Sequence, residues 1–153
     1  MSSPAIQKSS LNGKKDDELM PRVVTCIIEY QGNILLLKRS QKVGTYKGLW
    51  GGVAGFVEEG EEPYDTALKE LHEEVGLSQE NVRLGKKETP IKFTDVYEGR
   101  TYEWTIYPFL FHLIKKKDIR LDWEHTEFAW VAPKDLSRYP TVPHLEKVVQ
   151  VLL

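Results

Sequence analysis

The chain has 153 residues, which is close to the length of one ordinary domain. Its 21 basic and 23 acidic side chains give a net charge of −2, a balance that argues against a protein whose main task is to bind nucleic acid or an anionic membrane. Hydrophobic residues make up 41% of the sequence, enough for a core, so general disorder is excluded. The single cysteine, Cys26, excludes an intramolecular disulfide and a cysteine-based zinc site.

The N-terminal segment, residues 1–19, differs in composition from the rest of the chain. It is rich in serine and lysine, shows no hydrophobic period and has no apolar stretch typical of a secretory signal. No apolar run elsewhere approaches the roughly 18–20 residues that a membrane-spanning helix needs. We therefore expect a flexible tail at 1–19 and one folded domain at 20–153, in a soluble cytoplasmic protein.

The first part of the domain is predicted to be β-structure. Two apolar runs rich in β-branched residues, Val23–Tyr30 and Asn33–Arg39, are separated by Gln31-Gly32, which predicts a hairpin. The glycine-rich segment Trp50–Val57 predicts a bent strand.

The clearest predicted helix is Pro63–Val75, because Pro63 suits a first helical turn and Gly76 suits the C-terminal stop. A last helix is expected to begin near Thr141–Pro143, where apolar residues follow at helical spacing. Further strands are predicted at Val82–Thr89, Ile91–Tyr97, Thr101–Ile114 and Glu127–Val131. These elements favour a mixed sheet with at least two helices, most simply covering both faces.

Three glutamates lie close together on the Pro63–Val75 helix. Glu70, Glu73 and Glu74 are spaced i,i+3 and i,i+4, and on a helical wheel their arc begins on the flank of an apolar stripe. Like charges at these spacings destabilise an isolated helix, which suggests that a cation lies between them. Hard divalent cations such as Mg²⁺ prefer carboxylate oxygens. A solvated acidic face is the alternative interpretation.

Residues 55–77 read GFVEEGEEPYDTALKELHEEVGL. This segment resembles the Nudix box: glycine, five residues, glutamate, seven residues, then arginine-glutamate-aliphatic-any-glutamate-glutamate-any-glycine-aliphatic. Every fixed position matches except Lys69, where the family has arginine. The resemblance extends from Arg22 to Leu153 and implies an α/β fold, a Nudix-type α/β/α sandwich with a mixed sheet. It also implies hydrolysis of a diphosphate linkage in a nucleoside diphosphate derivative, of the nucleotide-sugar, dinucleotide or nucleoside triphosphate type.

The resemblance assigns roles to positions of this chain. Glu70, Glu73 and Glu74 would bind Mg²⁺ or Mn²⁺, with the carbonyl of Gly55 as an additional ligand. Lys69 would replace the arginine that orients these carboxylates, keeping its charge but losing the two-pronged guanidinium. Arg39 is a candidate phosphate clamp, with a surface arginine as the alternative. The implied partner is a small nucleotide rather than a membrane or nucleic acid, and a homodimer is common in the family.

Several alternatives remain open at this stage. A non-hydrolytic nucleotide-binding Nudix domain is made plausible by Lys69, and a prenyl diphosphate isomerase is disfavoured because nothing around Cys26 matches the cysteine motif of that relative. Glu124 and Glu127 lie where many Nudix enzymes have an extra carboxylate. Other candidates are histidines that could act as a base and tryptophans that belong either to the core or to a base-stacking surface: His125, His144, Trp50, Trp104 and Trp123.

Overall fold

The computed structural model describes residues 19–153, so the expected tail lies outside the described residues except for its last position. The predicted sheet and helices are present, with small shifts at their ends. In chain order the elements are β1 (Arg22–Tyr30), β2 (Asn33–Arg39), β3 (Trp50–Gly51), β4 (Val53–Phe56), α2 (Pro63–Val75), η2 (Gln79–Asn81), β5 (Val82–Lys87), β6 (Ile91–Tyr97), β7 (Arg100–Leu113), β8 (His125–Val131), η3 (Pro133–Arg138) and α3 (Leu145–Leu152).

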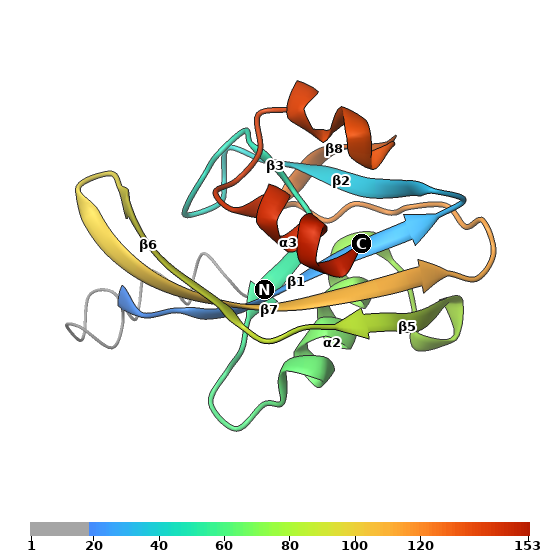
Figure 1. Ribbon diagram of the computed structural model, residues 1–153, viewed down its shortest axis with the longest axis horizontal. Helices are drawn as coiled ribbons and strands as arrows, with labels where there is room; N and C mark the ends of the chain where they lie inside the picture. The colour runs from blue at the N-terminus through green and yellow to red at the C-terminus, as the bar shows by residue number, and fades with distance from the viewer. Residues whose placement is uncertain (1–18) are drawn as a thin grey trace.

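One mixed sheet of eight strands forms the centre of the described domain (Figure 1). β1 pairs in parallel with β7 and antiparallel with both β2 and β4. β8 adds to β2, while β5 and β6 pair antiparallel with β7. The β6–β7 hairpin projects from the body of the sheet (Figure 1).

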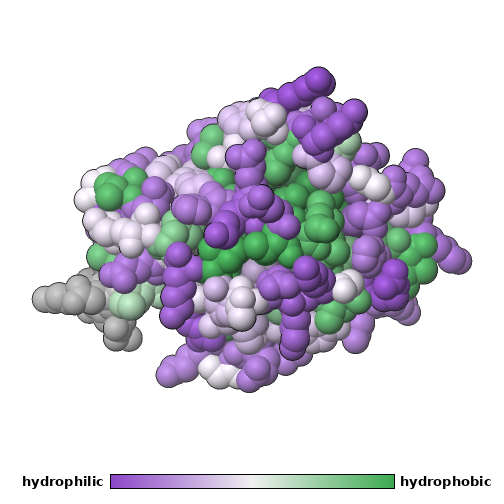
Figure 2. All heavy atoms as spheres, in the orientation of Figure 1, coloured by the Kyte–Doolittle hydropathy of each residue, from purple (hydrophilic) through white to green (hydrophobic). Residues whose placement is uncertain are grey.

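Helices α2 and α3 cover opposite faces of this sheet (Figure 1). Successive side chains of a strand point to opposite faces, and β1 accordingly sends Cys26 into the core cluster under α2 and Ile27 into the cluster under α3. Leu71 of α2 and Val148 of α3 bury the apolar faces of their helices. On the face shown in Figure 2, an apolar band runs between polar side chains where α3 packs on the sheet. The expected α/β/α sandwich is confirmed.

Helix α2 has the predicted bounds because its two ends are encoded locally. Pro63 occupies the first turn of the helix, where a backbone N–H has no acceptor within the helix, so the lack of an N–H in proline costs no hydrogen bond. Gly76 ends the helix in the left-handed region, at φ 75°, and its N–H bonds to the carbonyl of His72 while the Leu77 N–H reaches the Leu71 carbonyl. No helix in residues 19–153 combines the length and hydropathy needed to span a membrane.

The last helix begins later than predicted, at Leu145 rather than near Thr141–Pro143. Thr141 instead forms an isolated parallel bridge with Trp50. The Trp50 N–H bonds to the Pro140 carbonyl and the Trp50 carbonyl accepts the Val142 N–H, both at 2.9 Å. Backbone groups committed to the sheet edge cannot also begin a helix.

The predicted bent strand is divided into β3 and β4 at Gly52. A Cβ at Gly52 would lie 2.7 Å from the carbonyl oxygen of Cys26, so the two backbones approach too closely for any side chain. β3 therefore continues the pairing with β2, and β4 turns to pair with β1.

Candidate active site

Two of the three predicted carboxylates are buried between α2 and the sheet. The Glu70 and Glu74 residues are each 1% exposed, whereas Glu73 is exposed. Oε1 of Glu74 accepts a hydrogen bond of 3.3 Å from the backbone N–H of Ala54 in β4. Oε2 of Glu74 and both carboxylate oxygens of Glu70 have no hydrogen-bond partner from any other residue among 19–153, although the two carboxyl groups interact with each other. The expectation that all three glutamates only flank the core is therefore wrong for Glu70 and Glu74.

The space for Glu70 is created by a missing side chain at Gly55 of β4. A Cβ at this position would lie 2.3 Å from Cδ of Glu70 and 2.5 Å from its Oε2. The backbone φ of Gly55 is outside the left-handed region, so the requirement is for room rather than for conformation. The first glycine of the predicted box thus allows the first glutamate of the cluster to lie against the sheet.

Burial makes these carboxylates hard to ionise. It raises the pKa of Glu70 to about 7, and the nearby charge of Glu73 adds to the effect. The pKa of Glu74 is also raised, first by burial and then by the charges of Glu70 and Glu124. If both groups were ionised, three of their four oxygens would have no hydrogen-bond donor among residues 19–153, which is costly for buried carboxylates.

A divalent cation fits this chemistry, because it would neutralise the pair and use the unbonded oxygens. Within residues 19–153, no three His, Cys, Asp or Glu side chains stand together as a preformed metal site. The fit consequently rests on the orphaned oxygens of Glu70 and Glu74. Glu73 and the Gly55 carbonyl stay predicted ligands.

Lys69 contacts a different glutamate from those it was predicted to orient. Its Nζ lies 2.9 Å from Oε2 of Glu61, whose Oε1 accepts hydrogen bonds from the Glu58 N–H at 3.0 Å and the Thr66 hydroxyl at 2.9 Å. The Glu58 N–H and Lys69 hold the pKa of Glu61 below its usual value. Burial alone would lower the pKa of Lys69, but its contact with Glu61 outweighs burial and raises it. Lys69 therefore fastens the loop that leads into α2.

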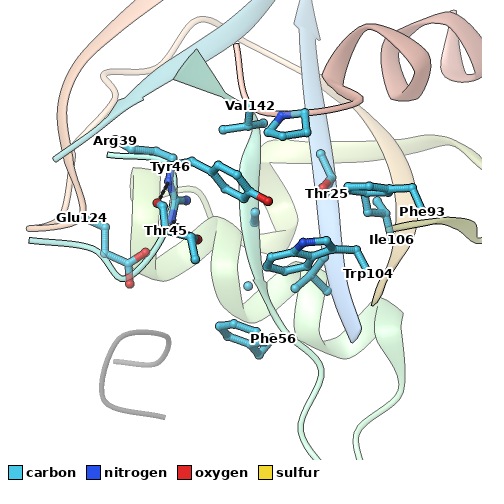
Figure 3. A pocket seen from close by; sticks show the side chains of 14 residues that line it. Thr25, Arg39, Thr45, Tyr46, Phe56, Phe93, Trp104, Ile106, Glu124 and Val142 are labelled. Atoms are coloured by element: carbon cyan, nitrogen blue, oxygen red, sulfur yellow. Dashed lines mark hydrogen bonds between the residues drawn. The ribbon is translucent and has the colours of Figure 1, made fainter. Parts of the chain in front are cut away.

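A pocket of about 100 Å³ opens beside the carboxylates (Figure 3). Gly55 and the buried Glu124 line the side nearest to α2, together with Arg39. The remaining lining is mainly aromatic and aliphatic, with rings from four separate segments of the chain: Tyr46, Phe56, Phe93 and Trp104. A pocket with charge at one side and apolar rings at the other suits a ligand with a charged part and a flat apolar part.

Arg39 is positioned as a wall of this pocket and is not a solvated surface arginine. Its Nε donates to the carbonyl of Thr45 at 2.9 Å, and its Nη2 donates to the Thr45 hydroxyl at 3.4 Å (Figure 3). Burial lowers the pKa of its guanidinium, and the charges of Glu74 and Glu124 oppose that effect. The geometry is compatible with the predicted phosphate clamp, which stays a prediction.

The loop between β2 and β3 closes one side of the pocket through Tyr46, a residue that the sequence reasoning missed. Its hydroxyl donates to Oδ2 of Asp95 in β6 at 2.5 Å, and its ring lies 4.9 Å from that of Tyr97. Burial and the Asp95 carboxylate raise the pKa of Tyr46. The sequence contained one signal for this side of the pocket. Phe93, Asp95 and Tyr97 alternate along β6, so their side chains lie on the same face of the strand.

His125, a candidate base from the sequence, lies beside the buried carboxylate of Glu74. Its Nδ1 lies 3.0 Å from Oδ1 of Asp122, and its Nε2 lies 3.8 Å from Oε1 of Glu74. The same Asp122 oxygen accepts the backbone N–H of Glu124 at 3.2 Å. The turn before β8 thus brings Glu124 to the pocket and His125 to α2. Glu127 pairs with Lys38 on the exposed side of β8 instead.

Comparison with known proteins identifies the family. The NUDIX domain family matches residues 19–152, nearly the whole described chain. The chain belongs to the Nudix family. It is 31% identical over 126 residues to the nucleoside triphosphatase NudI of Escherichia fergusonii, a match that covers 77% of this chain and 86% of that protein. The protein of the same name from Escherichia coli O81 is 30% identical over the same shares.

Solved structures agree on the Nudix fold. The dihydroneopterin triphosphate pyrophosphohydrolase of E. coli superposes with a TM-score of 0.72 at 22% identity, covering 86% of this chain and 94% of that one. A binary complex of the Ap4A hydrolase of C. elegans gives a TM-score of 0.69 at 18% identity, covering 86% and 93%. The expected family, fold and Nudix-type pyrophosphohydrolase class are confirmed.

Proposed function

We propose that this Nudix protein hydrolyses a diphosphate linkage in a nucleoside diphosphate derivative of the nucleoside triphosphate type, using Mg²⁺ or Mn²⁺. The observation that carries the proposal is the pair of buried carboxylates at Glu70 and Glu74, three of whose oxygens have no hydrogen-bond partner outside the pair among residues 19–153, beside an aromatic pocket. The substrate type is supported by NudI, which is named a nucleoside triphosphatase and shares 31% identity with this chain.

Each residue of the site has a distinct task in this proposal. Glu70 and Glu74 would hold the cation, with Glu73 and the Gly55 carbonyl as further ligands. When bound, the cation supplies positive charge for the diphosphate and lowers the pKa of a coordinated water. The guanidinium of Arg39 retains donors beyond those used by Thr45, and these would bind phosphate oxygens.

The surrounding contacts keep that arrangement in place before substrate arrives. The Lys69–Glu61 ion pair fixes the entry to α2, and the Ala54 N–H holds one oxygen of Glu74. Positioned groups of this kind act mainly on the transition state, because they need no rearrangement during the reaction. The aromatic side of the pocket keeps water away from the apolar part of the substrate.

The test is a panel of nucleotide sugars, dinucleoside polyphosphates and nucleoside triphosphates, incubated with Mg²⁺ or Mn²⁺ and scored by the identity of the released products. We expect a nucleoside monophosphate and pyrophosphate from the best triphosphate, and no product when the cation is chelated. Metal binding is measured separately by titrating Mn²⁺ into wild type and a Glu70→Gln variant. Nucleotide binding with no turnover on any substrate would favour the non-hydrolytic alternative and contradict the proposal.

A small nucleotide is the proposed partner, supported by membership of the Nudix family and by the similarity to NudI. We propose a cytoplasmic location and a homodimer on the family resemblance alone. Size-exclusion chromatography with light scattering tests the dimer directly, and a monomeric mass would contradict it.

A further inference from the structure

The loop between β2 and β3, residues 40–49, holds the guanidinium of Arg39 through one residue. Thr45 accepts two hydrogen bonds from it, at its backbone carbonyl from Nε and at its hydroxyl from Nη2. Thr45 is 3% exposed, so these bonds are shielded from water. The charges of Glu74 and Glu124 act on the same guanidinium. The direction in which Arg39 points therefore depends on where the loop places Thr45.

The next residue of the loop, Tyr46, has a backbone conformation that needs support from outside the loop. Its φ of 52° lies in the left-handed region, which is costly for a residue with a bulky side chain. Gln31 and Glu98 share this region, but each precedes a glycine in a hairpin turn that itself requires a positive φ. Tyr46 lies in a longer loop, and such a conformation persists where surrounding contacts determine it.

Strands β6 and β7 supply these contacts. The Tyr46 hydroxyl donates to Oδ2 of Asp95 at 2.5 Å, and its ring lies 4.9 Å from that of Tyr97. The Trp104 ring is 6.1 Å away, and its indole N–H interacts with the Tyr46 hydroxyl. Every residue of β6 from Ile91 to Tyr97 is paired with β7. Asp95 is consequently a fixed point to which the loop is attached (Figure 3 shows Tyr46 and Trp104).

We infer that Asp95 and Tyr46 are positioning residues for Arg39. Their hydrogen bond fixes the loop, and the loop fixes Thr45 and with it the direction of the guanidinium. The inference rests on the proposed function, in which Arg39 binds phosphate oxygens. Asp95 does not line the pocket, so its effect on a substrate passes through the loop.

Direct contact between Tyr46 and the substrate is the competing explanation, because Tyr46 lines the pocket. The two explanations differ in what the loss of the Asp95 carboxylate does, since that change leaves the tyrosine in place. They also differ when Arg39 is absent. An effect that passes through the guanidinium then disappears, whereas a lost contact or a general loosening of the pocket still adds to the loss.

The experiment compares wild type with Tyr46→Phe, Asp95→Ala and Asp95→Asn, and repeats the first two variants in an Arg39→Ala background. Asparagine keeps an acceptor oxygen for the tyrosine hydroxyl. Tyr97→Phe is the matched control, because it removes a hydroxyl from the neighbouring ring for which the structure shows no hydrogen bond within residues 19–153. Each protein is assayed with ATP, GTP, CTP and UTP in the presence of Mg²⁺. Binding of the non-hydrolysable α,β-methylene analogue of the best nucleotide is measured by calorimetry, together with thermal unfolding.

We expect Tyr46→Phe and Asp95→Ala each to lower kcat/KM by about tenfold, the effect of losing one hydrogen bond to a charged group. The loss should be equal for all four nucleotides, because they share the phosphates, and analogue binding should weaken in parallel. Asp95→Asn should regain most of the loss, and Tyr97→Phe should match wild type. In the Arg39→Ala background, neither change should weaken activity or analogue binding further. A loss confined to Tyr46→Phe, or one that persists without Arg39, would overturn the inference.

These outcomes separate the inference from the proposed function. If wild type hydrolyses a nucleotide and both variants keep its kcat/KM, the positioning role fails and the proposed function stands. If wild type binds the analogue without turnover and Asp95→Ala weakens that binding only when Arg39 is present, the positioning role stands and hydrolysis fails. If wild type neither hydrolyses nor binds any of these nucleotides, both are overturned.

Discussion

Replacing Gly55 by alanine tests whether the fit between strand β4 and Glu70 determines activity. The substitution adds one methyl group to a residue with no side chain of its own and no positive φ. The backbone of β4 can therefore stay in place, paired with Val24 of β1. The strain falls on the carboxylate of Glu70, which is buried.

The size of the effect follows from the distances. The new Cβ would lie 2.3 Å from Cδ of Glu70, against about 3.4 Å for ordinary contact, so the carboxylate must move by about 1 Å. A misplacement of about 1 Å in an active site can reduce the rate by roughly 100-fold. Overpacking a core position costs about 1–3 kcal/mol of stability. We therefore expect kcat/KM to fall by about two orders of magnitude and Mn²⁺ binding to weaken.

Steady-state kinetics, Mn²⁺ titration and urea unfolding measure these effects. Gly51→Ala is the matched control, because its Cβ would meet Val142 at an ordinary distance of 3.4 Å. The double variant Gly55→Ala/Glu70→Asp shortens the crowded side chain and should regain stability relative to Gly55→Ala alone. Near-normal turnover and Mn²⁺ affinity in Gly55→Ala would refute the reasoning, since the carboxylate position would then not matter.

Three other changes have defined expectations. Glu74→Gln should lower kcat by at least about 100-fold at saturating Mg²⁺ while the unfolding temperature holds, because a neutral amide removes a buried charge; turnover close to wild type would remove Glu74 from the metal site. Lys69→Ala should lower kcat more than it raises KM, whereas Lys69→Arg should keep the wild-type kcat, since a guanidinium can also bond Glu61; equal kinetics in wild type and both variants would mean that the ion pair with Glu61 does not affect catalysis. The Gly32 N–H and His112 hold the pKa of Glu29 below its ordinary value of 4.5, so its stabilisation is complete above that pH and is lost as pH falls through the lowered pKa. Urea unfolding between about pH 6 and pH 3 should therefore show a smaller loss of stability for Glu29→Gln than for wild type; parallel curves would contradict the shift.

Local features could be predicted from the sequence because neighbouring residues determine them. Pro63 and Gly76 encode both ends of α2, and the structure reproduces both bounds. The hairpin at Gln31-Gly32 likewise depends on its own backbone, with φ values of 51° and 87°. The start of α3 was misplaced because Pro140 and Val142, on either side of Thr141, hydrogen-bond to Trp50 about ninety residues earlier, and a periodic pattern contains no information about that partner.

The pocket could not be predicted from the sequence either, because it also depends on contacts between residues that are far apart in the chain. Tyr46, Phe56, Phe93 and Trp104 come from four segments, and their rings meet through strand pairing and through the contact of the Tyr46 loop with β6. Composition identified Trp104 as either core or base-stacking without deciding between them. The structure buries Trp104 and also places it in the wall of the pocket.

The helical wheel misjudged the glutamates because burial depends on the facing strand as well as on the helix. Charged residues usually avoid the core, so a wheel assigns Glu70 and Glu74 to the flank of an apolar stripe. Opposite them, however, β4 carries Gly55, and the missing side chain leaves a space that only the carboxylate of Glu70 fills. The glycine and the glutamate are fifteen positions apart in the sequence, but they form one structural unit. A pair of buried carboxylates with unbonded oxygens lowers the stability of the fold, and a bound cation would offset that cost where it is also needed for chemistry.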